Sequence, residues 1–214
     1  MLEERDSTTS AGDVSENRGQ VLALLPLSLL EAVREHDRPL EILEDEDLTV
    51  SLPRRLGLTG VVSSQIQRYE QATGAGARVP VIEVTGLMQL VLRRPDAESI
   101  VRETGRRITR HRIGNDVPAS ARMLRRWDRL VFIPMRRAAR RLLRGLVGDV
   151  KATVTRPLVV RMSHAPLGNA GLHSCSVYTG ALDELVRLYS SQEHVVTHAK
   201  CTARGDSLCE WTVE

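Results

Sequence analysis

The chain has 214 residues, which is enough for one large domain with its own hydrophobic core. Its formal net charge is +3, only 3% of its residues are aromatic, and no apolar run reaches the length of a membrane span. Residues 1–18 are acidic and polar and lack the apolar stretch of a signal peptide, so we expect a cytoplasmic protein with reduced cysteines. The same composition predicts a disordered acidic tail at 1–18, followed by a single domain at 19–214.

Helical periodicity dominates the first half of the chain. Apolar residues recur at helical spacing in five segments, which are 24–36, 60–72, 84–92, 95–112 and 121–146. The fourth segment opens with a proline and acidic residues in its first turn, and the fifth is predicted to be interrupted at Pro134. Loops are predicted at 73–80 and 113–118, and short extended pieces at 40–43 and 48–52.

After Gly148 the sequence changes to short β-branched runs. These runs predict strands at 152–154, 158–162, 195–200 and 208–213. Between the second and third, Ser176–Tyr189 is predicted to be a helix, with one apolar face formed by Tyr178, Ala181, Leu182, Leu185 and Leu188. This order is typical of an α+β domain with helices packed on one face of a twisted antiparallel sheet.

Charge is distributed unevenly along the chain. Residues 1–50 carry thirteen acidic and four basic residues, a balance of −9, so the remainder carries +12. Fourteen arginines lie in the stretch 102–144. Such a stretch either binds nucleic acid, anionic lipid or an acidic partner, or forms a solvated helix face. Because Lys151 and Lys200 are the only lysines, arginine is the default cation here. We therefore favour the solvated face and do not expect nucleic-acid binding.

All three cysteines and a histidine lie in the last forty residues, at spacings that suit a metal site. They are Cys175, His198, Cys201 and Cys209. Zinc selects thiolate and imidazole ligands, and three sulfurs with one nitrogen complete a tetrahedron. Because no position is left for water, the pattern predicts a structural zinc ion and not a metalloenzyme.

The spacing of the last two cysteines indicates a hairpin. Cys201 and Cys209 lie symmetrically about Gly205, so a hairpin centred there would place them opposite each other. His198 has the wrong parity to share a strand face with Cys201, because side chains alternate along a strand. A bulge or twist near 199–200 is required if both residues bind one ion.

The third cysteine precedes the predicted helix Ser176–Tyr189. A helix N-terminus stabilises a thiolate, which favours Cys175 as a ligand. Three alternatives remain open at this point. The cysteines pack as small core hydrophobes, or the last two form a disulfide, or His173 or His194 takes the place of His198.

Several short motifs recur in one known family. They are the apolar strand 158–162, His173-Ser174-Cys175 before a helix, Tyr178-Thr179-Gly180, the strand 195–200, the closing Cys201, Gly205-Asp206 and Cys209-Glu210-Trp211, and the helical Thr104-Gly105-Arg106-Arg107. On these residues the segment 158–213, and more broadly about 98–214, resembles the 4-vinyl-reductase domain family.

The resemblance implies a fold like that of the TRAPP vesicle-tethering subunits, usually dimeric. In the family's aromatic-responsive sensory domains, zinc is held by three cysteines and a glutamate. Here the three cysteines match, and His198 stands where the glutamate would be. The resemblance also divides the domain into a helical N-terminal extension at 19–95 and a recognisable core at 96–214, closed by a zinc-clamped hairpin.

The resulting hypothesis is a non-enzymatic small-molecule-binding or sensory domain of a bacterial protein, with a structural zinc ion, acting as a homodimer. The low aromatic content favours a small apolar ligand, in a cavity between 121–146 and the sheet. One alternative is a TRAPP-like scaffold that binds a protein partner. The resemblance also implies a second, an accessory or carrier protein in tetrapyrrole (bacteriochlorophyll) synthesis. A reductase would need a nicotinamide or flavin site, but the glycines at 73–77 follow a helix and not the strand that precedes a dinucleotide-binding fingerprint.

Overall fold

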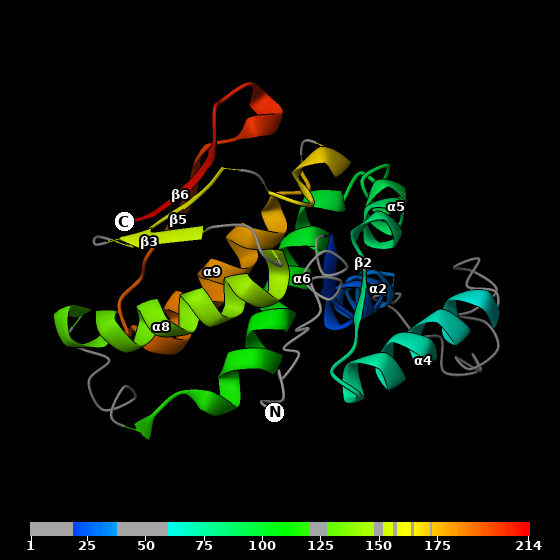
Figure 1. Cartoon of the computed structure of the whole chain (residues 1–214), viewed down its shortest axis with the longest axis horizontal. Helices are drawn as coiled ribbons and strands as arrows, with labels where there is room; N and C mark the ends of the chain where they lie inside the picture. The colour runs from blue at the N-terminus through cyan, green and yellow to red at the C-terminus, as the bar shows by residue number, and fades with distance from the viewer. Residues whose placement is uncertain are drawn as a thin grey trace, which may run out of the picture.

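A computed structural model of the chain gives an α+β fold (Figure 1). The residues that it describes are 19–37, 60–119, 128–147, 152–155, 158–163, 165–171 and 173–214. The tail predicted at 1–18 and the extended pieces predicted at 40–43 and 48–52 lie outside these residues. Within the described part, the predicted α+β class is confirmed.

The helices and strands follow the predicted order closely. The helices are α2 (Leu24–His36), α4 (Gly60–Gly74), α5 (Val81–Val91), α6 (Ala97–Ile113), α8 (Asp128–Val147) and α9 (Ser176–Tyr189). The strands are β1 (Gln20–Leu22), β2 (Arg78–Pro80), β3 (Ala152–Thr155), β4 (Val159–Met162), β5 (Val196–Lys200) and β6 (Cys209–Val213). Short 3₁₀ turns are η1 (Gly114–Asp116), η2 (Gly168–Ala170) and η3 (Thr202–Arg204). The bounds of α2 and α9 are those predicted.

A small two-stranded sheet near the N-terminal helices was not predicted. β1 and β2 pair antiparallel, with the buried side chains of Val21 and Val79 opposite each other. The Ala23 amide donates to the Ala77 carbonyl at 3.1 Å and extends this contact. The prediction that 73–80 is entirely loop is therefore wrong at both ends, since α4 also extends to Gly74. Three-residue strands are too short to show an alternation, and here long-range pairing determines them.

The predicted interruption at Pro134 is also wrong, because α8 continues through this residue. Proline removes one backbone hydrogen bond from a helix but need not end it when packing holds both sides. Val131 before the proline and Ala138 and Leu142 after it are buried in the core. The predicted start of this helix, at 121, falls outside the described residues.

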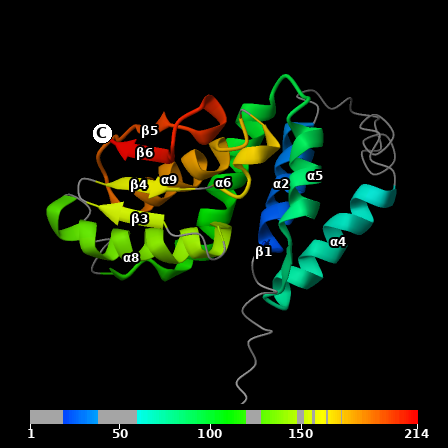
Figure 2. The same ribbon diagram turned by 45° about the horizontal axis from the view of Figure 1, so that its top comes forward.

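The larger sheet has the strand order β3-β4-β6-β5, and every neighbouring pair is antiparallel. Helices α8 and α9 lie along one side of this sheet, with α6 beyond α9 (Figures 1 and 2). Val160, Met162 and Trp211 are buried on the helix side, whereas Arg161 is exposed on the other side, where it pairs with Glu210. The sheet therefore packs helices on one face, as the alternation of its strands predicts.

Two glycines allow α6 and α9 to cross with their backbones in contact. A Cβ atom on Gly105 would lie 1.9 Å from the carbonyl oxygen of Val177, and one on Gly180 would lie 1.9 Å from that of Arg102. Beside this crossing, the Thr109 hydroxyl donates to the Ala181 carbonyl at 2.9 Å. The crossing fixes the position of α9, and thereby of the cysteine just before its first turn.

Candidate metal centre

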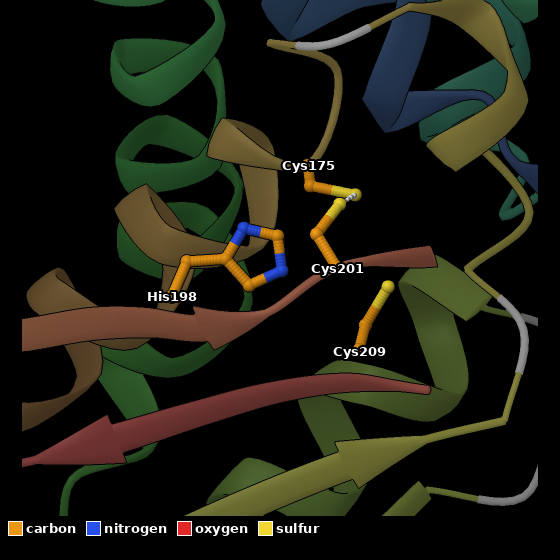
Figure 3. A group of neighbouring side chains, drawn as sticks. All are labelled: Cys175, His198, Cys201 and Cys209. Carbon is orange, nitrogen blue, oxygen red and sulfur yellow. Dashed lines mark hydrogen bonds between the residues drawn. The ribbon is translucent and has the colours of Figure 1, made fainter. Parts of the chain in front are cut away.

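The structure brings the four predicted residues together from three separate segments (Figure 3). Cys175 comes directly before α9, His198 and Cys201 belong to β5 and its end, and Cys209 begins β6. One ligand atom from each residue lies within 4.8 Å of all the others. The sulfur atoms of Cys175 and Cys201 face each other at 3.9 Å.

These dimensions fit a tetrahedral ion. Zinc–sulfur bonds of about 2.3 Å in a tetrahedron place neighbouring sulfur atoms about 3.8 Å apart. The Cys175–Cys201 sulfur distance of 3.9 Å matches this value. Cys175, Cys201 and Cys209 are buried, and His198 is partly buried. The cluster can therefore hold a metal ion, and its three sulfurs and one nitrogen form a donor set that zinc selects.

The hairpin that carries three of the four residues has the predicted irregularity. β5 and β6 pair antiparallel, but the register shifts between His198 and Lys200. This is the bulge that the parity of His198 and Cys201 required. Gly205 adopts a φ of +95° in the connecting turn, a left-handed conformation that glycine adopts without strain. The prediction of a hairpin around this glycine is confirmed.

Residues around the hairpin support the sulfur atoms, and the sequence did not single them out. The backbone amide and the hydroxyl of Thr202 each lie 3.4 Å from the Cys209 sulfur. The Asp206 carboxylate accepts a hydrogen bond from the Cys201 amide at 2.7 Å. Such donors and orienting contacts are typical of a second layer around metal ligands.

His198 presents a nitrogen atom with no partner. Its Nε2 atom is buried and has no hydrogen bond to another described group. Its ring stacks on Trp211, with 4.4 Å between ring centroids and 3° between planes. Burial, and next the charge of Arg204, lowers the pKa of His198 to about 4. The imidazole is therefore neutral at pH 7, and a buried unpartnered nitrogen is accounted for by a ligand role better than by core packing.

The thiol groups also fit a cation. Burial raises the pKa of the Cys175 thiol, and the neighbouring Cys209 and Cys201 raise it further. Three thiols this close cannot all ionise unless a cation balances their charge, and a divalent ion reverses the direction of the shift. Burial, and next the neighbouring Cys175, raises the pKa of the Tyr178 hydroxyl, against a weaker opposing effect of the Leu167 backbone.

The structure separates the alternatives left open by the sequence. The three cysteines are free thiols, so Cys201 and Cys209 do not form a disulfide. His173 Nδ1 lies 3.5 Å from the Glu98 carboxylate, and His194 Nε2 lies 3.0 Å from the Ser190 hydroxyl. Neither belongs to the cluster, in which the histidine is His198.

The lowered pKa of His198 predicts a pH dependence of stability when no cation is bound. An unfolded histidine takes up a proton near its ordinary pKa of 6.5, whereas folded His198 does so only near 4. The stability is therefore fully present above pH 6.5 and falls as the pH is lowered from 6.5 to 4. Urea unfolding of chelator-treated protein should show this decline, and His198→Gln should flatten it. An equal decline in both proteins would contradict the assignment.

Four arginines of α6 form ion pairs within the fold. With one arginine of α9 and five carboxylates they join α2, α6 and α9 in one network, whose formal charge is zero. The network comprises Arg102, Arg106, Arg107, Arg110, Arg187, Glu31, Glu35, Glu103, Asp183 and Glu184. Glu103 pairs with three of these arginines and connects the branches of the network, and at the α9 end the buried carboxylate of Glu184 lies 3.2 Å from Arg110 and 2.7 Å from Arg187.

Part of this network borders a groove of about 760 Å³. The groove lies beside the C-terminal half of α9 and the segment 190–196 that leads into β5. Its walls include Arg102, Arg106, Asp183 and Glu184. Apolar side chains such as Val186 and Val196 complete the lining, and we call it the polar groove after its charged wall only. α9 connects it to the cysteine–histidine cluster at the other end of the helix.

Fold and site together define an α+β protein with a Cys/His cluster that can hold a metal ion. Comparison with protein-family models, curated proteins and solved structures found no match for the chain. The resemblance to the 4-vinyl-reductase family therefore stays a prediction from motifs. Among the described residues, no helix is both long and apolar enough to cross a membrane.

Proposed function

We propose that this protein is a non-enzymatic small-molecule-binding or sensory domain of the 4-vinyl-reductase type, with a structural zinc ion. Cys175, His198, Cys201 and Cys209 would hold the ion. The observation that carries the proposal is the convergence of these four donors within 4.8 Å, with an otherwise unpartnered imidazole nitrogen among them. The dimer follows from the family resemblance and belongs to the same proposal.

A structural role for the ion fits the site better than a catalytic one. Four protein donors fill a tetrahedron and leave no position for water or substrate. Three thiolates also carry more negative charge than one divalent ion can balance, which makes the ion a poor Lewis acid. The bound ion would join the start of α9 to β5 and β6, and would supply folding energy where the hairpin meets the helix.

The polar groove supports the ligand-binding part of the proposal. Its volume of about 760 Å³ falls in the range of about 300–1,000 Å³ that small-molecule sites occupy. Because arginine and carboxylate side chains form part of its wall, we propose a ligand with polar groups in place of the purely apolar one suggested by the low aromatic content. A ligand there would contact the same helix that directly follows Cys175.

Native mass spectrometry of protein purified without chelator tests both parts. We expect one zinc ion per chain in the wild type and in His173→Ala, and a loss in His198→Ala. His173 is a matched control because it lies outside the cluster. A wild-type chain without metal would overturn the zinc site. A zinc-loaded chain that never carries or takes up a small molecule would leave the metal site standing but contradict the ligand-binding role.

A further inference from the structure

Three arginines of α8 differ from the paired arginines of α6, because no described carboxylate contacts them. Arg137, Arg140 and Arg144 are exposed, and no described carboxylate pairs with them. Arg141 forms an ion pair of 3.1 Å with Asp116, in which both side chains are more than half exposed. Such exposed pairs contribute little, because water and salt screen them. The charge of α8 is thus not balanced within the described fold, in contrast to the neutral network around α6.

These arginines share one face of the helix with an exposed isoleucine. Residues three or four apart lie on the same side of a helix, which aligns Ile133, Arg137, Arg140, Arg141 and Arg144. We name these five residues the α8 basic face. Ile133 is 61% exposed, and it is among the few large apolar side chains on the described surface. The face therefore combines guanidinium groups with an apolar side chain.

The opposite face of α8 is fixed in the core. Its apolar side chains, Ala138, Ala139, Leu142, Leu143 and Leu146, are buried. The helix lies along the outer edge of the fold (Figure 2). Because its apolar side packs inward, the helix cannot roll over to insert that side into another medium. A partner would meet the α8 basic face only, as a row on a rigid surface.

We propose that the α8 basic face binds anionic phospholipid headgroups at a membrane surface. Charge complementarity carries the proposal. The four arginines of the face have one acidic contact among them, so the face carries a net positive charge that attracts anionic headgroups. Ile133 points to a membrane in particular, because an apolar side chain beside arginines gains contact in the interfacial region of a bilayer. This inference goes beyond the proposed metal and ligand sites and does not depend on them.

Nucleic acid fits the same row less well. Proteins that bind single strands stack bases on exposed aromatic rings, and the exposed large apolar residues of the described part are Ile82, Leu90, Ile133 and Val195, none of them aromatic. A recognition helix must also project into a groove of the duplex, whereas α8 packs against the fold along its length. The row would contact duplex phosphates without reading bases.

Vesicle co-sedimentation of the full chain at low ionic strength tests the proposal. The vesicles contain phosphatidylcholine alone, or phosphatidylcholine mixed with phosphatidylglycerol. We expect binding only to the mixed vesicles, and its loss as salt is added. Arg137→Glu/Arg140→Glu should lower the partition coefficient by at least about 100-fold, because each charge near an anionic surface contributes about fivefold. Arg78→Glu/Arg93→Glu, on exposed residues elsewhere, changes the net charge equally and should have a much smaller effect.

Two further comparisons identify the partner class. Ile133→Ser should weaken vesicle binding severalfold, whereas Ile82→Ser, at a residue 78% exposed on α5, should not. Short duplex DNA, titrated under the same conditions, should bind more weakly than the mixed vesicles. No binding to mixed vesicles, an equal loss in both arginine double variants, or tighter binding to the duplex would each overturn the proposal.

Discussion

Replacing Gly105 by alanine is expected to lower the free energy of unfolding by more than about 4 kcal/mol, at the upper end of single-substitution effects. The new Cβ atom would lie 1.9 Å from the Val177 carbonyl oxygen and 2.6 Å from the Ala181 amide nitrogen. Both are backbone atoms of α9, which cannot rotate aside as a side chain can. The two helices would have to separate, and the buried side chains between them would lose contact. Gly180→Ala should act alike, through the Arg102 carbonyl.

The matched control for this effect is Gly86→Ala in α5. Nothing lies within 4 Å of the position that its Cβ would take, and its φ is not positive. Alanine there should stabilise the protein by about 0.5–1 kcal/mol, because it restricts the unfolded chain and favours the helix. Urea unfolding of the three variants beside wild type measures both signs. A Gly105→Ala protein that unfolds at the wild-type midpoint would show that α6 and α9 do not cross at this point.

The sequence predicts best those features that depend on local periodicity or on a fixed geometric rule. The bounds of α2 and α9 follow from apolar residues at helical spacing, since each helix buries one continuous face. The bulge beside Lys200 follows from the alternation of strand side chains and the position of His198 relative to Cys201. Residues near in sequence determine both features, so no knowledge of the tertiary fold is needed.

Features that depend on distant segments could not be predicted in this way. β1 forms because β2, almost sixty residues later, provides its partner. The helix through Pro134 persists because residues on both sides pack into a core whose shape the sequence does not show. The neutral charge of the α6 network also depends on where α9 places Asp183 and Glu184. A count of arginines cannot separate that network from the α8 basic face.

Around the candidate metal centre the same division holds. Residue type and spacing identified the four donors. The contacts of Thr202 and Asp206 depend on how the turn between β5 and β6 folds. In the sequence, only the Gly205-Asp206 pair indicates this turn, because aspartate is typical of turns in which a side chain binds the nearby backbone. The stacking of His198 on Trp211 follows from strand register, which was predicted only in part.

A single helix connects the elements on which the proposed function depends. α9 follows Cys175 at its start, crosses α6 at Gly180, and borders the polar groove through Asp183 and Glu184. Trp211 of β6 donates a hydrogen bond to the Thr179 hydroxyl of α9 at 3.1 Å. The metal cluster, the helix crossing and the groove are thus connected through one packed helix. A change at the cluster is therefore expected to affect the rest of the fold.

Removal of the proposed zinc ion is therefore expected to destabilise the whole protein. Cys209→Ser should abolish metal binding and lower the free energy of unfolding by at least about 4 kcal/mol, which corresponds to an ion present at a thousand times its Kd. The physical reason is the position of β6 in the sheet. Cys209 begins this strand, and β6 pairs with both β4 and β5, so loss of order there would affect both neighbours. Without the ion, the start of this strand would be held only by contacts such as those from Thr202 to its sulfur.

Calorimetry with and without a chelator separates loss of the ion from loss of packing at the substituted cysteine. The wild type should show a large fall in Tm when EDTA is added, whereas Cys209→Ser should already melt low and should not respond to the chelator. His173→Ala, outside the cluster, should respond as the wild type does. Hydrogen exchange should rise first at the amides of β5, β6 and the first turn of α9, the segments that the ion would join. A wild-type Tm unchanged by EDTA would mean that the four donors do not clamp this fold through a metal.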